Sequence, residues 1–231
     1  FRELGKPAGA ALPATERRRA TLVTRLALDV ASEALGDSDP ASVTAVFACS
    51  GGEVAVIHGI FDQLAGDDRR LSPTAFHNSV HNAAAGYWSI ASGSHHPADS
   101  LCAYDDSFAA GLGEALLRCA SGGQRVLLVA YDMPPLFPIA EFRPIRQPFA
   151  SALLLLPSSA GDGLARLRGG WAAEAPNGEP MADPALESLR QDNPAARCLP
   201  LLAAIAAGRN AELSFGYGMG GSLRLRVEAF G

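Results

Sequence analysis

The pattern of apolar and polar positions divides the chain into alternating helical and strand-like stretches. Apolar residues at three- and four-residue steps predict one helix from Thr15 to Leu35, which ends at Gly36. A short apolar run from Val43 to Ala48 then has the length and composition of a buried strand. The apolar stripe of the helix consists of Leu22, Val23, Leu26, Ala27, Val30 and Ala34.

A second helix is predicted after a turn at Cys49 to Gly52. Its expected buried side carries Val54, Ile57, Phe61 and Leu64. The succession of helix, strand and helix is typical of an α/β layered fold, in which helices cover both faces of a sheet.

The stretch from Ser72 to Gly93 predicts a short helix or turn, followed by a helix over Ala83 to Ala91. Ser72-Pro73 and Asn82 are both typical of helix starts. The small residues Ala83 to Gly86 would let another backbone approach closely. We therefore expect this helix at a packed interface, within the chain or between two chains.

The stretch around which the chain is organised runs from Ser100 to Arg118. A short apolar strand over Ser100 to Tyr104 is expected to lead into an acidic corner, Asp105 and Asp106, and then into an amphipathic helix. Acyl-transfer enzymes place nucleophiles at such corners, because the free backbone N–H groups of the helix stabilise an anion.

The remaining elements are shorter. The predicted strands are Arg125 to Tyr131, Ala150 to Leu156, Leu164 to Leu167 and a last strand with Leu223, Leu225 and Val227 inward and Arg224 and Arg226 outward. The predicted irregular segments are a proline-rich loop from Met133 to Pro148 and a connection from Gly169 to Asn193, with a helical turn at Pro184 to Arg190. A short apolar helix is predicted after this connection, from Leu199 to Ala207, and Gly208 ends it. A strand follows the glycines of Phe215 to Gly221, so we interpret them as a turn between strands, not as a phosphate loop.

Composition excludes several classes of protein. A 231-residue chain with 48% hydrophobic residues can bury a sizeable core, and its net charge of -5 gives no electrostatic reason to bind nucleic acid. The basic cluster Arg17 to Arg19 is expected to be a solvated helix face or a partner contact. The apolar runs are far shorter than the roughly 20 residues that span a bilayer. Without a visible signal peptide, a cytoplasmic protein is expected.

Cysteines and histidines give no metal or cofactor signature, so none is predicted. The cysteines are far apart and are expected to be buried thiols in a reducing compartment: Cys49, Cys102, Cys119 and Cys198. His77 and His81 lie four residues apart without a third ligand at useful spacing, so we interpret them as hydrogen-bonded structural histidines.

At the acidic corner a carboxylate stands where a nucleophile is expected. Cys102 falls within the predicted strand and should point into the core. The helix dipole keeps Asp105 ionised, which makes it a poor nucleophile toward a thioester. Its expected role is that of a helix N-cap.

Three stretches resemble β-ketoacyl synthases. SPTAFHNSVHNAAAGYWSI looks like their loop and helix along the dimer interface and acyl pocket, and CAYDDSFAAGLGEALLRCASGGQRVLLVAYD like their nucleophile strand, nucleophile helix and following strand. SFGYGMGGSLRLRVE is similar to their C-terminal glycine loop and last strand. The resemblance implies one thiolase-like layered domain over residues 1–231, with an N-terminal half at about 15–167 and a shortened remainder at 168–231.

The same resemblance implies that the condensing triad is missing. The alignment of GEAL at Gly113 to Leu116 places the family's active-site cysteine on Asp105. The family's two catalytic histidines follow the nucleophile, whereas every histidine of this chain precedes Asp105. Such a chain resembles the chain length factors, which are non-catalytic partners of ketosynthases in type II polyketide and aryl polyene systems.

The implied function is a catalytically silent subunit that pairs with an active β-ketoacyl-ACP synthase and shapes the cavity of the growing acyl chain. It would meet the acyl carrier protein through that complex, and an isolated chain could form a homodimer instead. The candidate cavity-lining residues are His77, Val80, His81, Asp105, Asp106, Ser107, Phe215 and Gly216. The candidate dimer-interface residues are Ala84, Ala85, Tyr87, Trp88, Leu101 and Ala103.

Two alternatives stay open on the sequence. One is an acyl-thioester decarboxylase or hydrolase that uses Asp105 or Asp106 as a general base with His81 as its helper. The other is an acyl-binding or scaffold protein that never meets a ketosynthase.

Overall fold

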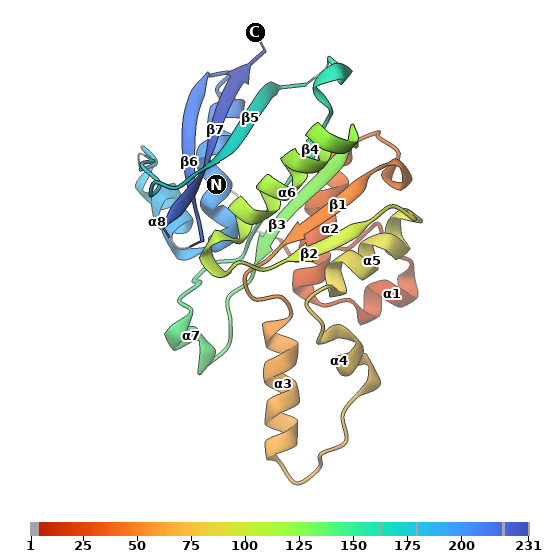
Figure 1. Cartoon of the computed structure of the whole chain (residues 1–231). Coiled ribbons are helices and arrows are strands. Elements are labelled where there is room, and N and C mark those ends of the chain that lie inside the picture. The colour runs from red at the N-terminus through yellow and green to blue at the C-terminus, as the bar shows by residue number, and fades with distance from the viewer. Residues whose placement is uncertain (1–4, 162, 179, 219, 231) are drawn as a thin grey trace.

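The computed structural model describes residues 5–161, 163–178, 180–218 and 220–230. Asp162 and Met219, which fall in two of the predicted turns, lie outside these ranges, as does Phe1. Two β-sheets lie on either side of the central helix α6 (Ser107–Gly122), and further helices cover the outer face of the first sheet (Figure 1). The α/β layered fold expected from the sequence is confirmed.

The first sheet, sheet A, has the strand order β2-β1-β3-β4. Its strands are β1 (Thr44–Ala48), β2 (Ala98–Leu101), β3 (Val126–Asp132) and β4 (Phe149–Leu155). β1 pairs in parallel with β2 and β3, and β4 is antiparallel to β3. Both central strands are buried along their whole length, as expected for strands covered on two faces.

The second sheet, sheet B, is antiparallel with the order β5-β7-β6. Its strands are β5 (Ala165–Ala172), β6 (Ala211–Tyr217) and β7 (Gly221–Ala229). Leu223, Leu225 and Val227 are buried, whereas Arg224 and Arg226 are exposed, which confirms the predicted alternation of the last strand. The inner face of sheet B packs on α6 and α9 (Leu199–Ala206).

The core occupies both faces of sheet A. On one face, α2 (Leu22–Leu35) and α5 (Ala83–Ser92) bury residues such as Leu28 and Trp88 against Phe47. On the other face, Phe108 and Leu112 of α6 pack between the two sheets. The remaining helices are α1 (Ala14–Arg19), α3 (Val54–Ala65), α4 (Pro73–Asn78), α7 (Ile139–Phe142) and α8 (Pro184–Asp192), with 3-10 turns at Pro40–Ser42, Tyr104–Asp106, Ser158–Ala160 and Pro194–Cys198.

The prediction of a single helix from Thr15 to Leu35 is wrong, because the helix is interrupted between α1 and α2. Ala20 is extended, and the Thr21 hydroxyl accepts a hydrogen bond from the backbone N–H of Thr24 at 3.1 Å. That hydroxyl also donates to Glu53 at 2.8 Å. Threonine side chains compete with helical hydrogen bonds in this way, which the apolar periodicity cannot reveal.

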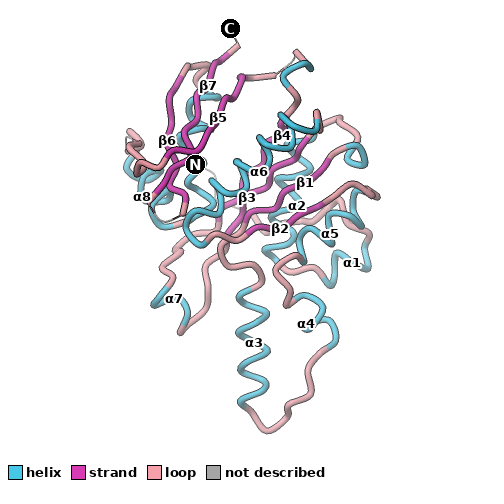
Figure 2. Tube along the Cα trace, in the orientation of Figure 1, coloured by secondary structure: helices cyan, strands magenta, loops and turns pink. Residues whose placement is uncertain are grey.

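The segment 54–80, which we call the arm, projects from the body as α3, a connecting loop and α4 (Figures 1 and 2). The helix α3 forms where predicted, but its predicted buried side is wrong. All twelve of its residues remain partly or fully exposed, with Phe61 at 62% and Leu64 at 40%.

Two further boundaries differ from the prediction. β2 ends at Leu101, so Cys102 follows the strand and is exposed; its predicted burial is wrong. Cys49 and Cys198 are buried as predicted. β5 extends to Ala172 and takes up the start of the predicted long connection. Across the described ranges, no helix is both long and apolar enough to cross a membrane.

Candidate functional site

The acidic corner joins β2 to α6 through a single turn of 3-10 helix. Tyr104 begins this turn at a φ of 54°, a left-handed conformation that side chains other than glycine rarely adopt. The Ser107 hydroxyl accepts from the backbone N–H of Ala103 at 3.0 Å and donates to the carbonyl of Tyr104 at 2.7 Å. Strained backbone of this kind persists where the surroundings hold it firmly, which occurs often at functional sites.

The carboxylate of Asp105 lies between two guanidinium groups. Its Oδ1 accepts from Arg143 Nη1 at 2.7 Å, and its Oδ2 accepts from Arg197 Nη2 at 3.1 Å. The predicted N-cap role is therefore wrong, because the N-cap position belongs to Asp106. Asp106 also faces away from the helix: it accepts from Arg197 at 3.4 Å and from the backbone N–H of Gly218 at 2.9 Å.

Arg143 is held from two sides. Its guanidinium carbon lies 3.7 Å from the centre of the Tyr104 ring, and only 19% of its side chain is exposed. Burial lowers the pKa of Arg143, but the hydrogen bond that Arg143 donates to Asp105, the contact with Tyr104 and the negative charge of Asp105 outweigh that effect, so the pKa is raised. Both oxygens of Asp105 thus accept hydrogen bonds from guanidinium groups of the chain itself, and each oxygen has a partner before any substrate binds.

A cavity of about 280 Å³ opens beside this corner. It brings together four of the residues that the sequence proposes as cavity lining: Asp105, Asp106, Phe215 and Gly216. Ser107 lies next to them but is buried, with 1% exposed. The cavity also contains Arg190, Gln191 and Ser214, which the sequence analysis did not single out. These residues come from α8 and β6, far from the corner in sequence.

The three other cavity candidates lie at the base of the arm. His77 and Val80 are exposed, and the His77 ring meets the Tyr87 ring edge-on at 5.9 Å. The Nε2 atom of His81 lies 3.1 Å from the carbonyl oxygen of Cys49. The general-base alternative needs His81 beside Asp105. In the structure, His81 instead contacts Cys49, and Asp105 contacts Arg143 and Arg197.

A buried polar cluster at the arm base was missed by the sequence analysis. Asp132 Oδ1 accepts from the backbone N–H and the hydroxyl of Ser50 at 2.9 and 2.7 Å, and from Cys49 Sγ at 3.4 Å. Burial raises the pKa of Asp132, and it also raises that of the Cys49 thiol, which disfavours the thiolate. An acidic residue that ends a buried apolar strand is the signal that could have revealed this cluster.

The candidate interface residues separate into two groups. Ala84, Ala85, Tyr87 and Trp88 are 1–3% exposed, because α5 packs them against α2 and sheet A within the chain itself. Leu101 and Ala103 keep part of their surface exposed at the end of β2. The small-residue face of α5 therefore serves the chain's own core.

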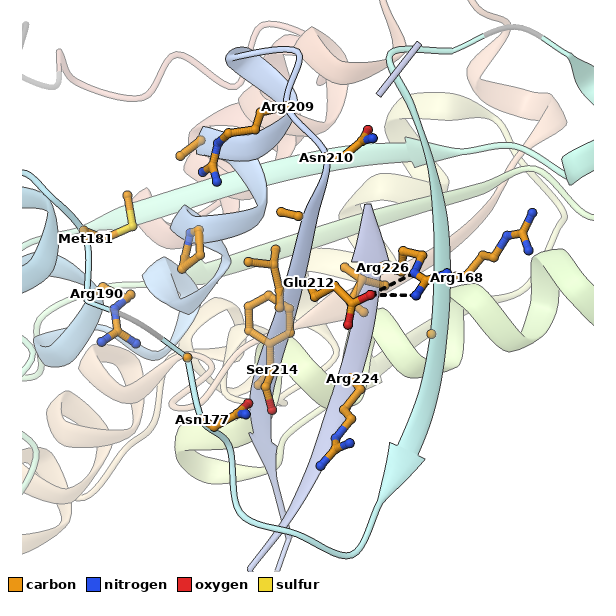
Figure 3. Close-up of a pocket in the computed structure, with 18 of the residues that line it drawn as sticks. Arg168, Asn177, Met181, Arg190, Arg209, Asn210, Glu212, Ser214, Arg224 and Arg226 are labelled. Atoms are coloured by element: carbon orange, nitrogen blue, oxygen red, sulfur yellow. Dashed lines mark hydrogen bonds and ion pairs between the residues drawn. The ribbon is translucent and has the colours of Figure 1, made fainter. Parts of the chain in front are cut away.

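A larger cavity of about 960 Å³ runs along β6 beside residues 177, 178 and 180–182 (Figure 3). Many of its charges are paired: Glu212 bonds Arg226 at 2.7 and 3.0 Å, and Glu187 bonds Arg190 at 2.6 and 2.8 Å. Within the described ranges, no cluster of three or more His, Cys, Asp or Glu side chains could hold a metal ion.

Comparisons with known proteins add the family. The family model for the beta-ketoacyl synthase N-terminal domain matches residues 2–211. A comparison with curated proteins found no match. Among solved structures, a ketosynthase (ApeO) in complex with its chain length factor (ApeC) from Xenorhabdus doucetiae is 26% identical, with a TM-score of 0.67 over 93% of this chain and 81% of that chain.

Two more structures share the fold at 14% identity. They are the ishigamide ketosynthase/chain length factor, with a TM-score of 0.69 over 97% of this chain and 85% of that one, and the type II polyketide synthase complex AntDE:AntF, with 0.70 over 98% and 89%. At this identity they bear on the fold alone, which is thiolase-like. Because the family model spans residues 2–211 of 231, the chain belongs to the family of β-ketoacyl synthase N-terminal domains.

Proposed function

We propose that this chain is a catalytically silent, chain-length-factor-like subunit that pairs with an active β-ketoacyl-ACP synthase. The observation that carries the proposal is the corner before α6, where Asp105 is bound between Arg143 and Arg197. A carboxylate fixed between two cations attacks a thioester poorly. All five histidines of the sequence come before this corner, so residues 106–231 contain no counterpart of the histidines that assist the family's nucleophile.

Uncovered apolar surface supports the pairing. Phe61, Leu64, Phe76 and Val80 of the arm are 40–67% exposed, and the proline-rich loop adds Leu136, Phe137 and Phe142 at 49–78%. Large exposed apolar side chains that gather on one surface mark protein–protein contact sites. β2, at the edge of sheet A, offers a further contact through its free side, with Leu101 and Ala103 at its end.

The likeness to ApeO in complex with its chain length factor ApeC supports the same assignment. By this proposal the partner supplies the nucleophile and the histidines, and it receives the acyl carrier protein. This chain contributes a wall of the acyl cavity. The system is of the type II polyketide or aryl polyene kind.

The test is co-expression with a candidate ketosynthase from the same organism. We expect a stable heterodimer by size-exclusion chromatography with light scattering, and condensation of acyl-ACP with malonyl-ACP by that heterodimer. Replacement of the ketosynthase's own nucleophilic cysteine by alanine should abolish condensation although this chain is intact. A chain that stays monomeric or pairs only with itself, beside a ketosynthase that is fully active alone, would refute the proposal.

A matched pair of variants tests the contact surface. Phe61→Ser removes an exposed ring from the arm, and Leu164→Ser removes a 76% exposed side chain next to sheet B. We expect Phe61→Ser to weaken the heterodimer at least tenfold, since aromatic anchors dominate interface energies, and Leu164→Ser to leave it unchanged. Equal effects of the two variants would place the partner elsewhere.

A further inference from the structure

The proline-rich loop between β3 and β4 exposes aromatic side chains, although it contains little regular secondary structure. Its one helix, α7, is four residues long. Phe137, shortly before α7, and Phe142, the last residue of α7, are 71% and 78% exposed. We call the exposed side chains of Leu136, Phe137 and Phe142 the aromatic ridge, after its two phenylalanines. A four-residue helix is not stable by itself, so contacts with the body must set the position of the ridge.

Arg143, directly after the ridge, provides such a contact. It bonds Asp105 at 2.7 Å across 38 residues of sequence and lies over the ring of Tyr104. The side chains of Arg143 and Asp105 are 19% and 41% exposed, so this partly buried ion pair is less screened by water and salt than a fully exposed pair. Hydrogen bonds between two charged groups are also stronger than neutral ones.

Asp105 binds a second distant segment at the same time. Arg197 belongs to the 3-10 turn Pro194–Cys198, and it bonds both Asp105 and Asp106. One carboxylate thus joins the end of the ridge to the segment before α9. The loop has other attachments as well: Pro135, directly before the ridge, and Ile145 are buried. Asn193 donates to the carbonyl of Gln147 at 2.9 Å, and Arg146 lies 3.6 Å from Asp192.

We propose that Asp105 is a positioning residue: through Arg143 it fastens the aromatic ridge to the corner and so sets the surface that the ridge presents to the partner. The left-handed backbone of Tyr104 fits this role, because it turns the ring under the guanidinium group of Arg143. The part that concerns the partner rests on the proposed function. The fastening itself is a property of this chain alone.

Hydrogen exchange on the isolated full chain tests the fastening. Asp105→Ala and Arg143→Ala should each raise amide exchange in residues 136–145 by about tenfold, as expected for loss of a charge-assisted hydrogen bond that holds a locally opening segment. The double variant should exchange about as fast as the faster of the two single variants and well below the sum of their effects, since both remove the bond between Asp105 and Arg143. Asp105→Asn keeps the shape of the side chain and is less prone to a folding defect. It should raise the amide exchange rate of residues 136–145 less than Asp105→Ala does.

Chemical rescue separates the charge from the shape. Formate at high concentration should occupy the space left in Asp105→Ala and restore slow exchange, whereas chloride at equal ionic strength and the Arg143→Ala variant should show no rescue. Asp68→Ala is the control, because Asp68 pairs with Arg70 at 2.8 Å on the exposed surface of the arm. Exchange that stays at the wild-type rate in Asp105→Ala, or strictly additive effects in the double variant, would overturn the proposal.

Binding to the ketosynthase gives the second readout. Asp105→Ala should weaken the heterodimer about tenfold, and formate should restore it, because loosening of the ridge lowers the fraction of chains that are ready to bind. If the ridge loosens but the affinity stays unchanged, the ridge does not face the partner and that part of the proposal is wrong. A wild-type chain that binds no ketosynthase refutes the proposed function, whereas the exchange result still decides the fastening.

Discussion

α5 and α3 are apolar helices of 10 and 12 residues that differ in burial. α5 buries Tyr87 and Trp88 against α2 and sheet A, whereas every residue of α3 stays partly or fully exposed. Both helices lie in the crossover between the parallel strands β1 and β2. One helix suffices to cover the sheet in such a crossover, so the topology leaves the other without a surface to cover. Apolar content alone therefore does not distinguish a core helix from a docking helix.

The largest expected effect is in α5. Trp88→Ala removes a ring that is 98% buried and lies 6.5 Å from the ring of Phe47. We expect a loss of about 3 kcal/mol in the free energy of unfolding, at the lower end of the range for tryptophan truncation. The lower end applies because, among the described residues, the indole N–H of Trp88 has no hydrogen-bond partner, and its removal relieves that cost. Urea unfolding followed by circular dichroism measures it.

Phe61→Ala in α3 is the counterpart of this variant. It removes a ring that is 62% exposed, so the free energy of unfolding should change by no more than about 0.5 kcal/mol. A loss of more than about 1.5 kcal/mol would mean that α3 packs on the body of the isolated chain, and the contrast between the two helices would fail.

Two glycines give a smaller but sharper contrast. A Cβ on Gly111 of α6 would lie 2.7 Å from the Ala48 Cβ and 3.0 Å from Leu128, whereas a Cβ on Gly59 of α3 meets open space among the described atoms. Gly111→Ala should therefore destabilise the chain by about 1–3 kcal/mol through overpacking. Gly59→Ala should stabilise it by about 0.5–1 kcal/mol through helix propensity. Thermal unfolding of both variants should shift in opposite directions, and shifts of the same sign would contradict this assignment.

Much of the fold could be predicted from local pattern. The alternation of Leu223, Leu225 and Val227 with arginines defined the last strand and its buried face, and the run ending at Tyr131 defined β3 to within one residue. Such elements bury one face or both against the body of the chain, so the pattern of apolar residues in their sequence shows which faces are buried. The corner before α6 was predictable for the same reason, from a strand followed by a helical stripe.

The chemistry of the corner could not be predicted in the same way. The partners of Asp105 are 38 and 92 residues away along the chain, so its local sequence suggested an N-cap. The exposure of α3 and the break at Thr21 likewise depend on contacts made in the folded chain, such as the hydrogen bond from Thr21 to Glu53. A single sequence contains no sign of these pairings, because they follow from the topology.

The last prediction concerns the attachment of the arm to the body, where the effect depends on pH. Glu53 directly precedes α3, is 4% exposed, and accepts hydrogen bonds from Thr21 and Thr24 at 2.8 and 2.6 Å. Burial raises the pKa of Glu53 above 4.5, although the two threonine hydrogen bonds act in the opposite direction. The folded chain therefore holds this proton more tightly than the unfolded chain does.

It follows that the stability contributed by protonated Glu53 is complete below pH 4.5 and is lost as the pH rises through the folded pKa. Each unit by which the pKa is raised corresponds to about 1.4 kcal/mol. Glu53→Gln keeps an oxygen acceptor for the threonines without the charge, so its stability relative to wild type should rise between pH 4.5 and neutrality. Unfolding of both proteins across this range measures the difference. If the difference in the free energy of unfolding between the two proteins does not change with pH, Glu53 is in contact with water. In that case the arm is loosely attached to the body at its base.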